Sequence, residues 1–101
     1  MRRWRFVKYV IRTYPELEAA RPLEPEDNRQ FEAVDRAVRW TEKLPSGPRR
    51  MKIVELLYWR ERPCSLRKAA QTVGYSYQHA AFVHRQFLYM VAANLEGEAI
   101  A

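Results

Sequence analysis

The sequence predicts an all-α fold, a helical bundle that ends in a helix-turn-helix. Apolar residues recur at intervals of three and four, and clusters of Pro and Gly divide the chain into segments of helical length. Only three of the 101 residues are Gly, which argues against a turn-rich β fold. With 48% hydrophobic residues, a chain of this length can bury a core without a metal or a disulfide.

A first helix is predicted from Trp4 to Tyr14, because apolar residues recur there at helical spacing. The same segment is rich in β-branched and aromatic residues, so a strand remains an alternative. Pro15 should end either element, because the residue before a proline is disfavoured in the α region. The acidic residues 16–28, which include prolines, then form a connector. Three basic residues share the side of the helix opposite its apolar face: Arg5, Lys8 and Arg12.

A second helix is predicted to begin near Pro25, which would lie in its first turn, with Asp27 or Asn28 as the N-cap. Its apolar positions follow at intervals of three and four: Phe31, Val34, Val38 and Thr41. The breaker at residues 44–48 ends this helix, and Ser46 should cap a third one. The apolar face of the third helix is expected at four positions: Met51, Val54, Leu57 and Tyr58.

A short helix is predicted over residues 66–73, after a break at residues 60–64. Ser65 precedes it and is a favourable N-cap, because its hydroxyl can accept a hydrogen bond from a free backbone amide of the first turn. Gly74 follows it, at the position where a left-handed residue commonly closes a helix.

A final helix is predicted over residues 77–95, capped by Ser76 and stopped by Gly97. The small Ala70 lies where this helix and the short one must approach closely. A short helix, a three-residue turn that begins with Gly and a longer helix form the pattern of a helix-turn-helix, whose second helix enters the DNA major groove. A helical hairpin that does not bind DNA is the alternative.

We expect these elements to form one compact unit with two parts. Residues 1–47 would supply the N-terminal helices and the acidic, proline-rich connector, and residues 48–97 the helix-turn-helix domain. Three tryptophans at apolar helical positions are expected to anchor the core or an interface: Trp4, Trp40 and Trp59.

The charge of the chain is basic and unevenly distributed. Its 18 Lys and Arg residues exceed its 12 Asp and Glu residues, which gives a net charge of +6. Residues 48–85 alone carry eight basic and two acidic residues. This segregation favours a polyanionic partner such as double-stranded DNA, although solvated helix faces are the alternative. The same two interpretations stay open for the stripe Arg5, Lys8 and Arg12.

The predicted DNA contacts lie on the final helix and on the two helices before it. In a helix-turn-helix the first helix crosses the backbone, and helix N-terminal amides also favour phosphates. The expected phosphate-binding residues are Arg49, Arg50, Arg67, Lys68 and Arg85. Glutamine can pair with adenine, and a phenyl ring can contact the thymine methyl group. The expected base-reading residues are Tyr77, Gln78, His79 and Phe82.

Residues 48–95 resemble region 4 of sigma-70 type factors, in the segments IVELLYW and SLRKAAQTVGYSYQHAAFVHRQFL. With the VGYS turn and the upstream segment FEAVDRAVRWTEKLP, the chain is similar to small phage regulators of late transcription of the ArpU/RinA type. The resemblance implies a cytoplasmic transcription regulator of phage or prophage type, which reads promoter DNA and contacts RNA polymerase. It does not decide the target site, activation against repression, or whether the protein is a homo-oligomer.

The first turns of the reading helix depart from that family. Sigma region 4 carries Arg, Glu and Gln there, whereas this chain has Tyr77, Gln78, His79, Ala81 and Phe82. A less charged face fits a protein contact as well as a DNA contact. The alternative function is therefore a helical adaptor that binds RNA polymerase or a phage packaging component rather than DNA.

The residue patterns do not predict an enzyme, a metal site or a cofactor. Cys64 is the one cysteine, so neither an intrachain disulfide nor a cysteine zinc site is expected. His79 and His84 are five residues apart, which separates them around a helix, and both are expected on its surface. The sequence also lacks a Gly-rich phosphate loop.

No membrane partner is expected, and the predicted location is the cytoplasm. The longest apolar run, residues 87–93, is much shorter than the roughly 18–20 residues that cross a bilayer. Lys8 interrupts the apolar stretch near the N-terminus and no small-residue cleavage site follows it, so a signal peptide is not expected.

Overall fold

The computed structural model describes residues 2–100, and the side chains of residues 3–97. Its α-helices are α1 (Arg2–Ala19), α2 (Pro25–Glu42), α3 (Gly47–Val54), α4 (Leu66–Val73) and α5 (Tyr77–Ile100), and the π-helix η1 (Glu55–Trp59) continues α3. No strand occurs within residues 2–100, which confirms the all-α prediction. Over the same residues, no helix is both long enough and apolar enough to cross a membrane.

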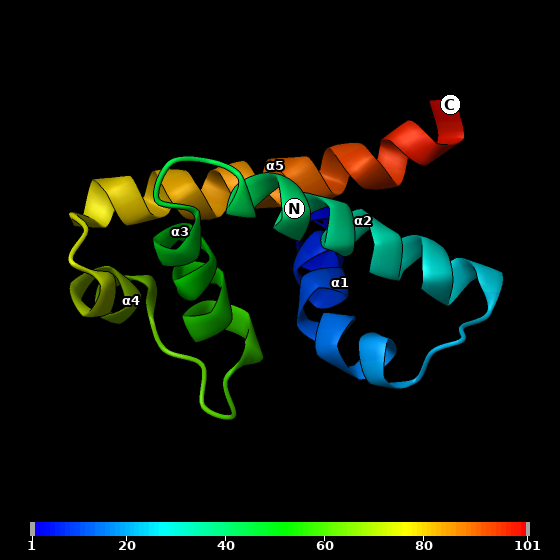
Figure 1. Ribbon diagram of the computed structural model, residues 1–101, viewed down its shortest axis with the longest axis horizontal. Coiled ribbons are helices and arrows are strands. Elements are labelled where there is room, and N and C mark those ends of the chain that lie inside the picture. The colour runs from blue at the N-terminus through cyan, green and yellow to red at the C-terminus, as the bar shows by residue number, and fades with distance from the viewer. Residues whose placement is uncertain (1, 101) are drawn as a thin grey trace.

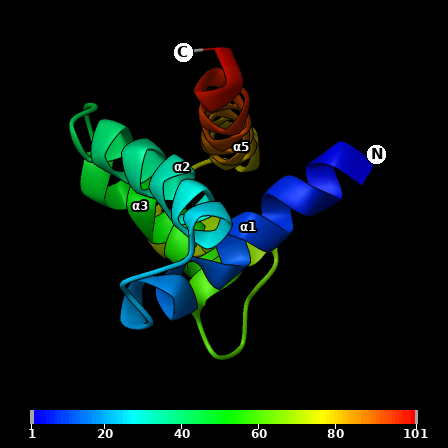
Figure 2. The same cartoon turned by 90° about the vertical axis from the view of Figure 1, so that its right-hand side faces the viewer.

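Helix α5 extends along the molecule, and the other helices lie on one side of it (Figure 1). Helices α3 and α4 are at its amino-terminal end, and α1 and α2 are at its carboxy-terminal part. Figure 2 looks nearly along α5 and shows α1 and α2 below it on different sides. The expected boundary between residues 47 and 48 falls in the first turn of α3.

Two clusters of buried side chains hold this arrangement together. The first core joins α1, α2, the α3–η1 segment and the carboxy-terminal part of α5, and its buried side chains include Val7, Ile11, Tyr14, Phe31, Val34, Tyr58, Phe87 and Leu88. The second core joins α3, η1, α4 and the amino-terminal part of α5, at Ile53, Leu56, Ala69, Ala70, Ala80 and Val83. Because α5 and the α3–η1 segment contribute to both cores, they fix the position of α4 relative to the N-terminal helices.

Helix α1 does not end at Pro15, so that prediction was wrong. The helix continues through Pro15 to Ala19. A proline inside a helix has no N–H to donate to the carbonyl four residues earlier, here that of Ile11. The indole Nε1 of Trp59 donates to this Ile11 carbonyl at 2.7 Å. A side chain from η1 therefore replaces the hydrogen bond that the proline removes.

Helix α2 begins at Pro25, as expected, but Asp27 and Asn28 do not cap it. Glu24 occupies the N-cap position without a side-chain capping bond, and Asp27 lies in the first turn, where a negative charge is favourable. Ser46 occupies the N-cap position of α3, yet its backbone is left-handed at φ 60° and its hydroxyl makes no capping bond. The prediction that Ser46 caps through its side chain was therefore wrong.

Two further boundaries differ from the prediction. The connector between the first two helices is short, because α1 ends at Ala19 and α2 begins at Pro25. Gly97 does not stop α5, which continues to Ile100. A glycine inside a helix costs only about 1 kcal/mol relative to alanine, so continuation of the helix on both sides outweighs it.

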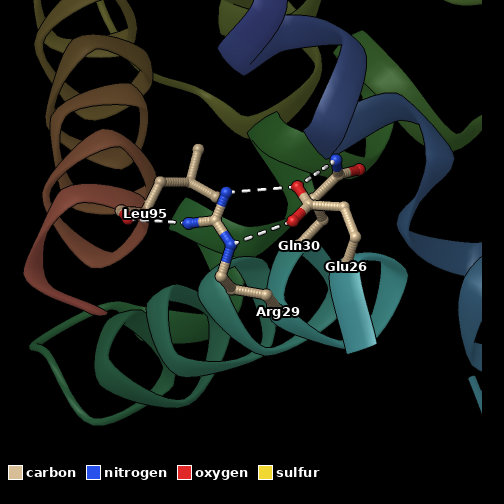
Figure 3. A network of polar contacts seen from close by, with 4 residues as sticks. All are labelled: Glu26, Arg29, Gln30 and Leu95. Atoms are coloured by element: carbon tan, nitrogen blue, oxygen red, sulfur yellow. Dashed lines mark hydrogen bonds and ion pairs between the residues drawn. The ribbon is translucent and has the colours of Figure 1, made fainter. Parts of the chain in front are cut away.

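Polar contacts fasten α2 to the carboxy-terminal part of α5. Arg29 donates to the Leu95 carbonyl at 2.9 Å and to the Glu26 carboxylate at 3.1 Å, and Gln30 donates to the same carboxylate (Figure 3). One turn further along α2, the amide of Asn94 donates to the Ala33 carbonyl at 2.9 Å. These bonds fix the axial position of α5 against α2.

Candidate nucleic-acid interface

The amino ends of α4 and α5 are capped as predicted. The Ser65 hydroxyl accepts a hydrogen bond from the Lys68 amide at 3.1 Å. The Ser76 hydroxyl accepts one from the His79 amide at 3.0 Å. Each serine satisfies an amide that the helix itself leaves without a partner. Together the two caps fix where the short helix and the long helix begin.

The end of α4 is fixed by Gly74, which has the predicted left-handed backbone at φ 80°. The amide of Tyr75 donates to the Ala70 carbonyl at 2.9 Å, and the amide of Gly74 donates to the Gln71 carbonyl at 3.3 Å. This pair of bonds is the Schellman arrangement that closes many helices. It directs the chain into α5 within three residues.

Replacing Gly74 by valine should destabilise the fold by about 1–3 kcal/mol, because a β-branched residue is strained at positive φ. A Cβ at this position would also lie 3.2 Å from the Arg49 guanidinium. Thermal unfolding followed by circular dichroism measures the loss. A melting temperature equal to that of the unchanged protein would contradict the strained turn.

Arg49 holds the turn from the neighbouring helix α3. Its Nη2 donates to the Val73 carbonyl at 2.6 Å, and its guanidinium lies 4.5 Å from the centre of the Tyr75 ring. The imidazole of His79 stacks on the same ring, with the centroids 4.0 Å apart. The contact of Arg49 with the turn was not predicted from the sequence. Its contact with a DNA phosphate stays a prediction.

The four predicted base-reading side chains lie on the first turns of α5 and are exposed. Tyr77 and Phe82 each expose 45% of their surface, which is high for aromatic side chains in a small protein. Gln78, Phe82 and Arg85 follow one another at spacings of four and three, so they share one side of the helix. This outward face is opposite the buried Ala80, Val83 and Phe87.

The four predicted phosphate-binding residues other than Arg49 fall into two groups. Arg67, Lys68 and Arg85 are exposed on α4 and α5, and the Arg67 guanidinium lies 4.9 Å from the centre of the Tyr77 ring. Arg50 is half-buried, and donates to the Pro45 carbonyl at 3.2 Å and to Oε1 of Gln86 at 2.7 Å. Arg50 therefore joins the start of α3 to α5, which the sequence did not predict.

His84 is half-buried against η1 rather than exposed on the helix surface, so that expectation was wrong. Its Nε2 lies 2.6 Å from the Tyr58 hydroxyl, which reaches it from η1. Burial lowers the pKa of His84 to about 4, helped by the positive charges of Lys8 and Arg85, and raises the pKa of Tyr58 to about 12. With this pKa the imidazole is neutral at pH 7, and its Nε2 can accept a hydrogen bond from the Tyr58 hydroxyl.

Two grooves flank the outward face of α5 and include residues that were not predicted as contacts. One, of about 460 Å³, lies beside Trp40, Phe82, Tyr89 and Met90. The other, of about 250 Å³, lies beside Trp4, Lys8 and Leu88, and both are bordered by Arg85 and Tyr89. Trp40 and Tyr89 expose 41% and 56% of their surface. Helical periodicity could have placed Tyr89 on this face, but not Trp40, which comes from α2.

The geometry thus brings Gln78, Phe82 and Arg85 to one face, with Arg67 and Lys68 on the adjacent helix. Within the side chains that the structure describes, no group of three His, Cys, Asp or Glu residues is arranged to hold a metal ion. Comparison with protein-family models, curated proteins and solved structures finds no match to this chain.

Proposed function

We propose that this protein binds duplex DNA through the first turns of α5 and regulates transcription, as a regulator of phage or prophage type. The observation that carries the proposal is the outward face of α5. Gln78, Phe82 and Arg85 are exposed there, and the exposed cations Arg67 and Lys68 lie on the helix before the turn. Residues 48–85, which contain all five, carry eight basic and two acidic residues.

Each group has a chemical part in this proposal. The major groove admits one α-helix, and only outward side chains reach the base edges. The Gln78 amide can donate to and accept from adenine, and the Phe82 ring can contact a thymine methyl group. Arg67, Lys68 and Arg85 would hold phosphates, which position the helix without reading sequence. The contacts of Arg49 and Arg50 keep the turn and α5 in place.

Binding to duplex DNA should weaken steeply with salt. The three cations Arg67, Lys68 and Arg85 on phosphates would give a slope of log affinity against log salt of roughly −3, at about −0.9 for each phosphate. Fluorescence anisotropy with a labelled random duplex over a series of salt concentrations measures this slope. A flat response would contradict the DNA proposal and favour the adaptor function.

Gln78→Ala and Lys68→Ala should impair binding in different ways. Loss of a bidentate contact to adenine costs roughly 1–3 kcal/mol at one base pair and leaves non-specific affinity nearly unchanged. Loss of a phosphate contact instead weakens all sequences alike and reduces the salt slope by about one. The assay compares a duplex selected from a random library with its scrambled version, for both variants.

Arg21→Ala is a matched control for Lys68→Ala. Arg21 is an exposed cation whose guanidinium lies 4.7 Å from the centre of the Phe31 ring. The segment between α1 and α2, which contains it, lies at the opposite end of the molecule from α4 (Figure 1). Its removal should leave the salt slope unchanged, which separates a local phosphate contact from a change of net charge. If Gln78→Ala keeps the sequence preference intact, the assignment of α5 as the reading helix is wrong.

The groove beside Trp40 favours a second candidate function, a helical adaptor that binds a protein such as RNA polymerase or a packaging component. Exposed aromatic side chains are enriched at protein interfaces, and Phe82 and Tyr89 lie on the same face as Gln78. If the protein is an adaptor, we expect Phe82→Ala and Trp40→Ala to abolish binding to the protein partner. Gln78→Ala and Lys68→Ala should then leave that binding intact. For a DNA-binding regulator, Trp40→Ala leaves duplex affinity unchanged.

A further inference from the structure

A small cavity lies between α4 and the segment that precedes it. It has a volume of about 150 Å³, and three cationic side chains line it: Arg60, Arg62 and Lys68. Leu56, Cys64 and Thr72 complete the lining. Since one water molecule occupies about 30 Å³ in the liquid, a cavity of this size can hold a small oxyanion with part of its hydration shell.

The charge of this cavity is unbalanced. No carboxylate lines it. Glu55, on the adjacent turn of η1, faces the ammonium group of Lys52 at 3.5 Å. Among the side chains that the structure describes, those of Arg60, Arg62 and Lys68 take part in no hydrogen bond, ion pair or ring contact. Three cations around one small cavity repel one another, and an anion between them would turn this repulsion into attraction.

The walls of the cavity are held by hydrogen bonds that do not use these cations. The amide of Cys64 donates to the Leu56 carbonyl at 3.0 Å, which fastens the end of the connecting segment to η1. The hydroxyl of Thr72 donates to the Lys68 carbonyl at 2.9 Å. Neither bond uses a cationic group, so the guanidinium and ammonium groups stay free to bind a ligand.

We propose that this cavity binds one phosphate group of a nucleic-acid backbone. An arginine guanidinium presents parallel N–H donors that match two oxygens of a phosphate, and a lysine ammonium adds a compact positive charge. Two arginines and one lysine fit the several oxygens of a phosphate better than the two oxygens of one carboxylate. The inference rests on the proposed function for the source of the phosphate, and it adds Arg60 and Arg62 to the residues predicted from the sequence.

The position of the cavity agrees with this ligand. Lys68 and Thr72 lie on one side of α4, and Arg67 lies on another side, over the Tyr77 ring of α5. A backbone that passes α5 on the Tyr77 side and continues across α4 would meet Arg67 first and the cavity next. The amino end of α4 carries a partial positive charge, and it begins at Leu66, between the lining residues Cys64 and Lys68.

The first test uses inorganic phosphate and the full-length chain. Titration with sodium phosphate, against sodium chloride of equal ionic strength, should shift the amide NMR signals of residues 60–62, 64 and 68, with saturation. The double variant Arg60→Gln, Arg62→Gln should lose these shifts, and the control Arg21→Gln should keep them. Absence of saturable shifts in the unchanged protein, or shifts that persist in the double variant, would overturn the site whether or not the protein binds DNA.

The second test uses duplex DNA. The double variant should reduce the salt slope by about 0.9, which corresponds to one phosphate, and weaken a selected duplex and a scrambled duplex equally. If the unchanged protein binds duplex and the double variant keeps its affinity and slope, the backbone phosphate does not occupy the cavity. If the unchanged protein binds inorganic phosphate in the cavity but no duplex, the proposed function fails and the nucleic-acid source of the phosphate fails with it.

Discussion

Gly47→Ala should destabilise the protein by about 3 kcal/mol, the upper part of the usual range for forcing extra atoms into a packed site. A Cβ at Gly47 would lie 2.9 Å from the Thr41 carbonyl oxygen and 2.8 Å from the Glu42 carbonyl carbon, and closer still to the Glu42 oxygen. These are backbone atoms of the last turn of α2, which cannot rotate away as a side chain can. The methyl group must therefore separate α2 from α3.

Urea unfolding measures this loss, and Gly97→Ala is its matched control. Gly97 lies inside α5, and a Cβ there meets no atom within 4 Å. The control should be stabilised by up to about 1 kcal/mol, because alanine is the better helix former. A Gly47→Ala variant as stable as the unchanged protein would show that α2 and α3 are not packed this closely.

The sequence predicted the local features of the fold well, because their causes lie within a few residues. Ser65 and Ser76 cap through amides three residues ahead, and Gly74 closes α4 through carbonyls three and four residues behind. Ser46 failed as a cap because residues 44–47 form a tight turn that places its backbone in the left-handed region. A capping residue needs extended backbone, and this turn is incompatible with it.

The features that the sequence missed have causes far along the chain. Helix α1 continues through Pro15 because Trp59, from η1, satisfies the Ile11 carbonyl. Arg49 holds a carbonyl 24 residues away, at Val73. Periodicity alone gives no information on such pairings, since many registers of helix packing are compatible with the same apolar stripes.

The same distinction applies to the candidate site. The exposure of Gln78 and Phe82 follows from the helical period around Ala80, Val83 and Phe87, so the sequence could predict it. The cavity of Arg60, Arg62 and Lys68 needs the segment before α4 to fold back along that helix. No spacing rule predicts this fold-back, because residues 60–64 have no repeating structure.

Stability should fall by up to about 3 kcal/mol between pH 7 and pH 4 because of His84 alone. The pKa of this imidazole is about 4 in the folded protein, against 6.5 for an ordinary histidine. The unfolded chain therefore binds a proton as the pH falls through 6.5, while the folded protein does not until about pH 4. The stabilisation is complete above pH 6.5 and is lost between these two values, at about 1.4 kcal/mol per pH unit.

The variant His84→Gln isolates this effect from the carboxylates, which titrate in the same range. A glutamine carbonyl can accept the hydrogen bond of the Tyr58 hydroxyl but carries no titrating proton. Urea unfolding at pH 7 and pH 4 should show a smaller loss of stability in His84→Gln than in the unchanged protein. The matched control His79→Gln removes an exposed histidine from the same helix and should keep the full pH dependence. Equal pH dependence in both variants would mean that His84 is solvated and protonates freely in the folded protein, which is incompatible with its contact to Tyr58 between α5 and η1.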